Sequence, residues 1–484
     1  MDETSYRKKV MGCWLGKAVG GTLGQPYEGS AGPLALSYYD PVPTDMVPND
    51  DLDLQVLWCC ILAGMERPVV DRDVFARGWL EHVDFPWDEY ALAIRNLKQG
   101  IRPPWSGQYD NYFRDGLGAA IRSELWACLA PDDPERAARF AYEDACVDHA
   151  GDGIYAEQFW AAAESRAFTV SDLDRLLDTG LSVIPGDCRL ARAVADVRKL
   201  CAVETDPLKI RRHVLDNWGA ENFTDTVMNT AFAVMALILG KGDFSKSICL
   251  AVNCGQDADC STATAGAILG LIDPDSIDPK WLKPIGHKLI LNDGIRGIRA
   301  PSTLEGFSDM IFALRERIAL RGDVAEEREP DLTAFAVPAD CGFFKPWFAH
   351  DEGRFSPRLP EVTQRRVFPG CFAGIANSEI APDGLFMMRF RFELDAPRKA
   401  RVMFNCNGNH LVWIDGDYAF GREGGRMAPS FHRAPRNQFK DLALSAGKHE
   451  ILVGLARTDR ADEIRWVIGV AEQGSKQWIP VRWF

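Results

Sequence analysis

The period of the hydrophobic pattern changes once along this chain, near residue 322, and this change predicts two domains of different fold class. Before that point, apolar residues recur at helical spacing in two stripes, Leu52, Val56, Cys59, Cys60 and Ala63, and Leu117, Ile121, Leu125 and Cys128. Residues 226–239 are apolar on nearly all sides, with Thr224 or Asp225 as a cap and Gly240 as a stop. Such a helix belongs in the centre of a large bundle. We therefore predict an all-α domain over residues 1–325.

Residues 326–345 are charged and contain proline, so we interpret them as a linker. After them the apolar period becomes 2, as expected for a half-buried antiparallel strand, with one face formed by Phe386, Met388, Phe390, Phe392 and Leu394. Further strand candidates, separated by turn signals such as Asn407-Gly408, are residues 401–406, 410–415, 449–456 and 464–472. The pattern predicts a β-sandwich over residues 346–484.

Composition narrows the classes of function. The 484 residues are 46% hydrophobic and 26% charged, as in globular proteins, with a net charge of -14 and no dense Lys/Arg run. Nucleic-acid binding is therefore not expected. No apolar run approaches the ~20 residues of a membrane helix. The thirteen cysteines are scattered without zinc-binding spacing, so we expect reduced thiols and a cytoplasmic protein.

Two acidic clusters stand directly before predicted helices. The first is Asn49-Asp50-Asp51-Leu52-Asp53, and the second is Gln256-Asp257-Ala258-Asp259-Cys260-Ser261-Thr262. One acid at a helix N-terminus is explained by capping. Several carboxylates close together repel one another unless cations neutralise them, and Mg²⁺ prefers oxygen ligands. The residues alone leave capping and metal binding open.

Two other segments are candidates for a site. Gly16, Gly20 and Gly24 recur every four positions and would let a second helix approach closely, in a segment that ends at Glu28. Glu28 is either a loop acid or a functional one. His149, within Asp148-His149-Ala150-Gly151, closes one predicted helix before the next begins near Ile154. A lone histidine in such a place is either structural or catalytic.

Taken together, these four segments resemble the ADP-ribosylglycohydrolase family. The family pattern Leu-Gly-x-Pro-x-Glu is similar to residues 23–28, Thr-Asp-Asp-Thr to residues 49–52, Thr-His to residues 148–149, and Gly-Gly-Asp-x-Asp-Thr to residues 255–260. The order and spacing agree over roughly residues 6–320. The resemblance implies an all-α fold with two Mg²⁺ ions, or sometimes Mn²⁺, bound in a cleft.

By position, the resemblance also implies roles for individual residues. Metal ligands would be Asp50, Asp51, Asp257 and Asp259, with Asn49 supplying a side-chain oxygen in place of the usual Thr. Glu28 would contact a metal-bound water or the substrate hydroxyls, and His149 would contact the substrate. Catalysis would involve Glu28, Asp51 and Asp257.

The sequence departs from the family pattern at several of these positions. Asn49 and Cys260 replace hydroxyl ligands, Gly21 stands where the family usually has Asp, and Asp53 is added. A thiol is a poor ligand for Mg²⁺. Either Ser261 or Thr262 substitutes for it, or Cys260 leaves one metal site weaker or selective for Mn²⁺. These features indicate a divergent branch of the family.

We expect a metal-dependent hydrolase that cleaves an N- or O-glycosidic bond. A pocket lined from the segment 102–113 would add substrate contacts from Arg102, Tyr109, Asp110 and Asn111, unless that segment is a surface loop. The substrate would be a glycoside, either protein-linked ADP-ribose or a small glycoside or nucleoside. A non-catalytic sugar- or ADP-ribose-binding module is the alternative. The β domain resembles galactose-binding-like or jelly-roll modules, and otherwise it would stabilise the chain or assemble a homo-oligomer.

Overall fold

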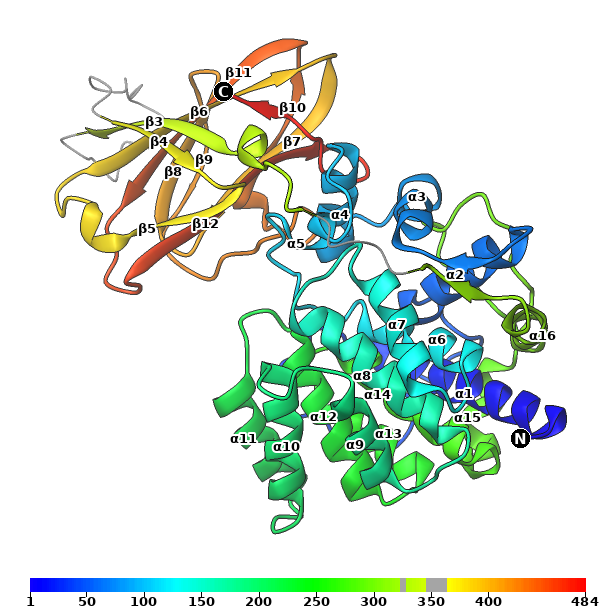
Figure 1. Ribbon diagram of the computed structural model, residues 1–484. Helices are drawn as coiled ribbons and strands as arrows, with labels where there is room; N and C mark the ends of the chain where they lie inside the picture. The colour runs from blue at the N-terminus through cyan, green and yellow to red at the C-terminus, as the bar shows by residue number, and fades with distance from the viewer. Residues whose placement is uncertain (323–327, 345–363) are drawn as a thin grey trace. The chain divides into compact units, whose positions relative to one another are not determined.

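The computed structural model describes residues 1–322, 328–344 and 364–484, and these form two compact units (Figure 1). The helical unit comprises residues 1–83, 102–108 and 113–327. The second unit, here called the β unit, comprises residues 84–101, 109–112 and 328–484. Residues 326–327 and 345 of the predicted linker, and 346–363 of the predicted β domain, lie outside the described residues. Each unit is described separately below.

The helical unit confirms the all-α prediction. Its longer helices are α1 (Glu3–Gly24), α2 (Asp50–Gly64), α3 (Arg72–His82), α6 (Ser123–Leu129), α7 (Pro134–Ala145), α8 (Asp152–Ala167), α9 (Leu173–Ser182), α10 (Arg189–Cys201), α11 (Pro207–Trp218), α12 (Thr226–Gly240), α13 (Phe244–Val252), α14 (Ala258–Ile272), α15 (Pro279–Ile285) and α16 (Leu304–Arg315). A single turn forms α5 (Trp105–Gln108), and β1 (Val69–Val70) pairs in parallel with β2 (Ala319–Leu320). None of the described helices is both long and apolar enough to cross a bilayer.

The apolar helix predicted at residues 226–239 is α12, and it lies inside the bundle. Asp225 caps it by accepting a hydrogen bond from Met228 N at 3.0 Å. It packs against α8, α10, α11, α13 and α14, as a helix without a polar face requires. The stripe at residues 117–128 forms a helix only in its second half, where a short 3₁₀ turn (Ala120–Arg122) leads into α6. The apolar stripe therefore begins before the helix does.

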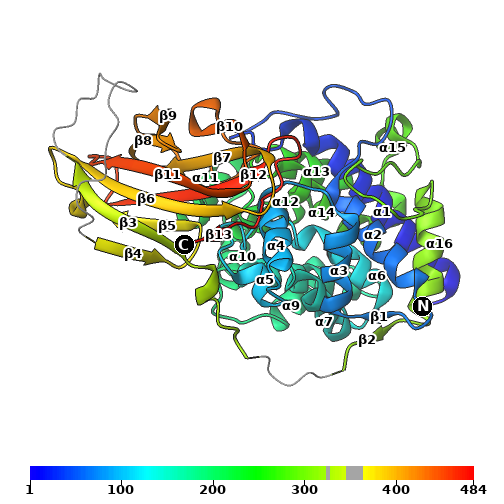
Figure 2. The same ribbon diagram turned by 90° about the horizontal axis from the view of Figure 1, so that it is seen from above.

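The helices α1 and α14 run antiparallel in close contact, and this contact places the candidate site (Figure 2). A Cβ atom added at Gly16 would lie 2.0 Å from Gly266 O, and one added at Gly24 would lie 2.3 Å from Asp259 Cα. Such distances are impossible for real side chains, so only glycine permits this approach. The prediction that the glycine face of α1 packs against another helix is confirmed, and it sets the end of α1 beside the start of α14.

The β unit contains two antiparallel sheets, which confirms the predicted sandwich. Its strands are β3 (Val337–Phe344), β4 (Gln364–Phe368), β5 (Phe372–Ala376), β6 (Leu385–Leu394), β7 (Arg398–Cys406), β8 (Asn409–Ile414), β9 (Asp417–Arg422), β10 (Phe439–Leu444), β11 (Gly447–Ala456), β12 (Glu463–Glu472) and β13 (Arg482–Trp483). One sheet has the order β10-β7-β12-β5 and the other β4-β3-β6-β11-β8-β9, with β13 beside β6. Aromatic rings from both sheets meet between them, including Phe368 against Trp466 at 5.1 Å.

The β unit also contains residues that the sequence pattern assigns to the linker or to the all-α domain. Strand β3 lies within the predicted linker, where its alternation is too short to distinguish from a polar crossing. Helix α4 (Asp88–Lys98) and residues 109–112 cluster with the β unit, although both fall inside the stretch predicted to be the all-α domain. Asp88 in α4 pairs with Arg433 at 2.8 Å, a long-range contact that periodicity alone does not reveal.

We expect the substitution Gly16→Ala to lower the free energy of unfolding by about 1–3 kcal/mol, because its Cβ would collide with the backbone of α14. The loss should appear even though alanine is the better helix former. Gly64→Ala is the matched control, since a Cβ there meets no described atom within 4 Å. Chemical unfolding followed by circular dichroism measures both variants, and equal stability of the two would contradict the close-contact argument.

Candidate functional site

The N-termini of α2 and α14 meet in the helical unit, although they are about two hundred residues apart in sequence. Asp51 in the first turn of α2 and Asp259 and Cys260 in the first turn of α14 each offer one ligand atom, and these three atoms lie within 4.8 Å of one another. Asp51 is 1% exposed and Asp259 is 3% exposed. The two sequence clusters therefore converge in a buried position.

Asn49 connects the two helices. Its Oδ1 atom accepts a hydrogen bond from Asp51 N at 2.9 Å, which caps α2. Its Nδ2 atom donates to Asp259 Oδ2 at 3.1 Å. Capping and the acidic cluster are thus not exclusive alternatives, because one amide serves both. Asn49 as a metal ligand through its oxygen stays a prediction.

Asp257 and Glu28 complete the group from two adjacent loops. The backbones of these loops pair, since Gly29 N donates to Gln256 O at 2.8 Å and Gln256 N donates to Ser30 O at 2.7 Å. Asp257 occupies the N-cap position of α14, but its side chain makes no capping hydrogen bond with the described residues. Its carboxylate is buried, whereas Glu28 is exposed at the edge of the cluster.

The electrostatics of these acids favour a bound cation. Burial raises the pKa of Asp257 well above its usual value, and the neighbouring charges of Asp259 and Glu28 raise it further. Burial, Glu28 and Asp51 together raise the pKa of Asp259 to about 7. Carboxylates in such a group remain charged at neutral pH only when positive charge lies beside them.

One such positive charge belongs to the protein, and sequence reasoning missed it. The Nζ atom of Lys17 lies 3.1 Å from Asp51 Oδ1 and 2.8 Å from Glu124 Oε1, and both Lys17 and Glu124 are fully buried. The signal was a single lysine in the otherwise apolar segment 10–21, where a buried charge needs a partner. Its second partner, Glu124, lies on α6 and is not part of any sequence motif identified above.

Two carboxylate oxygens of this group are suited to bind a divalent cation. Asp259 Oδ1 and Asp51 Oδ2 are both buried, and neither accepts a hydrogen bond from any described residue. Two such oxygens are suitable ligands for a hard divalent cation. Asp50 is half-buried at the first position of α2. Asp53 instead accepts a hydrogen bond from Asn292 N at 3.0 Å, so it holds a loop.

The two hydroxyl neighbours of Cys260 are engaged along their own helix. Ser261 Oγ donates to Asp257 O at 2.9 Å, and Thr262 Oγ1 donates to Ala258 O. Bonds of this kind to the preceding turn are usual for Ser and Thr in helices. Cys260, in contrast, lies beside Asp51 and Asp259. The geometry favours the cysteine over its neighbours as a ligand, while Ser261 as a ligand stays a prediction.

His149 is held by a buried ion-pair network between α7 and α8. Its Nδ1 atom lies 3.1 Å from Asp148 Oδ1, and the guanidinium group of Arg122 binds both oxygens of Asp148 at 2.8 and 2.9 Å. Although burial raises the pKa of Asp148, Arg122 and His149 hold it below its usual value. A charged Asp148 fixes the orientation of the imidazole ring. Contact of His149 with substrate stays a prediction.

The other predicted substrate residues do not belong to one group in the structure. Arg102 lies in the helical unit with its side chain 72% exposed, paired with Asp73 at 2.7 Å. Tyr109, Asp110 and the buried Asn111 belong to the β unit. Their binding of substrate stays a prediction.

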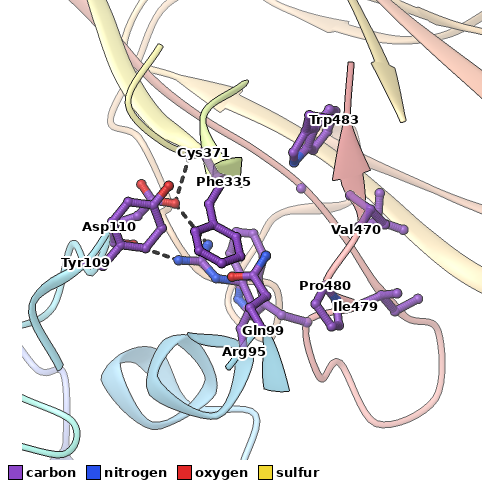
Figure 3. A pocket seen from close by; sticks show the side chains of 13 residues that line it. Arg95, Gln99, Tyr109, Asp110, Phe335, Cys371, Val470, Ile479, Pro480 and Trp483 are labelled. Carbon is purple, nitrogen blue, oxygen red and sulfur yellow. Dashed lines mark hydrogen bonds and ion pairs between the residues drawn. The ribbon is translucent and has the colours of Figure 1, made fainter. Parts of the chain in front are cut away.

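Within the β unit, Asp110 and Tyr109 line a small pocket (Figure 3). Asp110 pairs with Arg95 of α4 at 3.1 Å and accepts hydrogen bonds from Cys371 N and Phe372 N at 2.8 and 3.0 Å. Tyr109 donates its hydroxyl hydrogen to Pro369 O at 2.8 Å. These contacts fasten the segment 109–112 and α4 to the strands, which is a structural task.

Comparison with known proteins identifies the helical unit. The family model described as ADP-ribosylglycohydrolase matches residues 2–318. The chain belongs to this family. A solved structure titled "ADP-ribosylglycohydrolase-related protein complex" is 20% identical, with a TM-score of 0.42, and the match covers 65% of this chain and 99% of that one. A search of the curated proteins finds no match.

The family match spans the converging acidic residues and ends before the strands of the β unit. An ADP-ribosylglycohydrolase is a hydrolase, and the family is typically metal-dependent, which agrees with the acidic cluster. The comparison therefore supports a glycohydrolase-like function for the helical unit. It assigns no role to the strands of residues 328–484.

We expect Cys260 to coordinate a thiophilic cation directly. Addition of Co²⁺ to the protein should then produce a sulfur-to-cobalt charge-transfer absorption, because a coordinating thiol loses its proton. Cys260→Thr should abolish this absorption while still binding Mg²⁺. Cys249→Ser, a half-buried cysteine on α13, is the control. An unchanged absorption in Cys260→Thr would show that the thiol is not a ligand.

Proposed function

We propose that this chain is a metal-dependent hydrolase of a glycosidic bond. The observation that carries the proposal is the buried convergence of Asp51, Asp257 and Asp259, inside the segment that matches the family. Asp51, Asp259 and Cys260 would hold a divalent cation, with Asp50, Asp257 and the Asn49 oxygen as further candidates. A bound cation would orient the sugar hydroxyls and a water, and lower the pKa of that water.

Glu28 is the group best placed to move a proton. It is exposed at the edge of the cluster, whereas the three aspartates are buried. As general base it would take a proton from the attacking water, while the water oxygen bonds to the anomeric carbon. The bond between that carbon and the leaving group breaks in the same step, through an oxocarbenium-like transition state. The leaving group takes up the proton that Glu28 removed from the water, so the water is divided between the two products and Glu28 becomes charged again.

His149 is a candidate positioning or contact residue for the substrate. Its ring is oriented by Asp148, and Asp148 is neutralised by Arg122. Packing also fixes this turn, because a Cβ at Gly107 would lie 2.4 Å from His149 O. A preorganised imidazole of this kind loses little freedom when it binds a ligand.

The substrate class and compartment follow as expectations. We propose protein-linked ADP-ribose as the substrate, with a small glycoside or nucleoside as the alternative on the same centre. Release of ADP-ribose from modified protein, against release of a free base or monosaccharide, separates these two. None of the thirteen cysteines, all of which lie among the described residues, forms a disulfide, which supports action in the cytoplasm.

The double substitution of Asp257→Ala with Asp259→Ala should reduce turnover by more than about a hundredfold, since loss of an outer-shell partner alone costs roughly 10–100-fold. Asp216→Asn, an exposed acid on α11, is the control for a simple change of charge. Turnover is measured on ADP-ribosylated protein, a nucleoside and a small glycoside, each in the presence of Mg²⁺ and Mn²⁺. Retained turnover in the folded double variant would reject the metal-dependent reaction. If the wild-type protein binds ADP-ribose or a sugar but turns over none of these substrates, it is a binding module and not an enzyme.

Glu28→Gln should lower kcat by about 10²–10⁴, the usual contribution of a general acid or base. Its affinity for divalent cations should stay within a few-fold of the wild-type value, because Glu28 lies at the edge of the centre. Steady-state kinetics and calorimetry measure the two quantities on the same preparation. Loss of cation affinity equal to the loss in kcat would instead make Glu28 a metal ligand.

A further inference from the structure

The buried ammonium group of Lys17 lies inside the acidic centre, paired with two buried carboxylates. Lys17 is on α1 and 1% exposed, and its two partners, Asp51 on α2 and Glu124 on α6, are equally buried. Gln55, one turn after Asp51, donates from Nε2 to Glu124 Oε2 at 2.9 Å and accepts at Oε1 from Leu125 N at 2.7 Å. Three helices therefore hold the ammonium group in place.

Each of the two central carboxylates has one oxygen in contact with a protein nitrogen, through an ion pair at Asp51 and a hydrogen bond at Asp259. Asp51 Oδ1 faces Lys17 Nζ at 3.1 Å, and Asp259 Oδ2 accepts from Asn49 Nδ2 at 3.1 Å. Asp51 Oδ2 and Asp259 Oδ1 remain, buried and without a hydrogen-bond donor among the described residues. One oxygen from each carboxylate, beside the Cys260 sulfur, makes a ligand set for one cation.

A pair of cations would need a carboxylate with both of its oxygens available to bridge them. Two metal ions about 3.5–4 Å apart are held as a clamp that shares ligands, and a bridging carboxylate uses both of its oxygens. A second dication on Asp51 Oδ1 would lie close to the ammonium group of Lys17. Like charges at such a distance repel strongly where little water screens them.

Helix α1 accounts for both of these contacts. Lys17 pairs directly with one oxygen of Asp51. Gly21, one turn later, leaves space for the Asn49 amide that donates to one oxygen of Asp259. A Cβ at Gly21 would lie 3.3 Å from Asn49 Nδ2, so a longer side chain there would displace the amide. The two contacts thus come from neighbouring positions on one helix face.

We propose that Lys17 is a built-in cation that takes the place of one of the two metal ions, so that the centre binds a single divalent cation. Lys17 would act as a positioning residue, because it presents the Asp51 Oδ2 atom to that cation. This inference rests on the proposed metal-dependent function.

The test counts Mn²⁺ ions bound to the full-length chain by calorimetry and records their electron paramagnetic resonance spectrum. We expect one Mn²⁺ per chain with the spectrum of an isolated ion. Two bound ions with a spin-coupled spectrum in the wild-type protein would overturn the inference and leave the metal-dependent function standing. No bound Mn²⁺ would overturn the metal dependence itself, and the inference with it.

Variants test whether Lys17 is the cause. Lys17→Met combined with Glu124→Gln removes the ion pair without leaving a buried unpaired charge on α6, and the carbonyl oxygen of the introduced amide can still accept from Gln55. We expect this double variant to bind a second Mn²⁺ and to show spin coupling. Lys17→Arg keeps the charge and should keep one ion. A double variant that folds, by its circular dichroism, and still binds one ion would overturn the role of Lys17.

Discussion

The close antiparallel contact of α1 with α14 is the constraint on which the candidate site depends. Gly12, Gly16, Gly20 and Gly24 place the backbone of α1 against that of α14 over about three turns. This contact fixes the start of α14, where Asp257 and Asp259 lie, beside the loop that carries Glu28. It also sets Lys17 and Gly21 toward the N-terminus of α2. A packing feature of small residues thus determines the distances between charged ones.

Burial of several acids is costly, and the structure offsets the cost in two ways. Asn49 donates a hydrogen bond to one oxygen of Asp259, and Lys17 forms an ion pair with one oxygen of Asp51, which is the compensation that a buried charge requires. The remaining oxygens, Asp51 Oδ2 and Asp259 Oδ1, stay without donors among the described residues. An arrangement that satisfies half of each carboxylate and leaves the other half converging is better explained by ligand binding than by folding stability.

Much of this could be predicted from the sequence, for identifiable reasons. The apolar helix α12 and the alternating strand β6 have strong periods, and the glycine face of α1 has a four-residue repeat. Strand β3 and helix α4 could not be assigned correctly, because their partners are distant in sequence and a period says nothing about which unit a segment joins. Motif spacing predicted that Asp51 and Asp259 would come together. It could not reveal that Lys17 and Glu124 lie beside them, since neither belongs to a motif.

The unusual residues of the centre are easier to understand as a set than one at a time. An amide at Asn49 needs the space above Gly21, and it takes one oxygen of Asp259. Lys17 takes one oxygen of Asp51 and is itself held by Glu124. The Cys260 sulfur lies beside the Asp51 and Asp259 carboxylates, each of which has one oxygen in contact with a protein nitrogen. Because these residues contact one another, a change at one alters the coordination available to the others. Substitution of Cys260 alone by a hydroxyl residue leaves the contacts of Lys17 and Asn49 in place, and on the single-cation proposal it would therefore not create a second cation site.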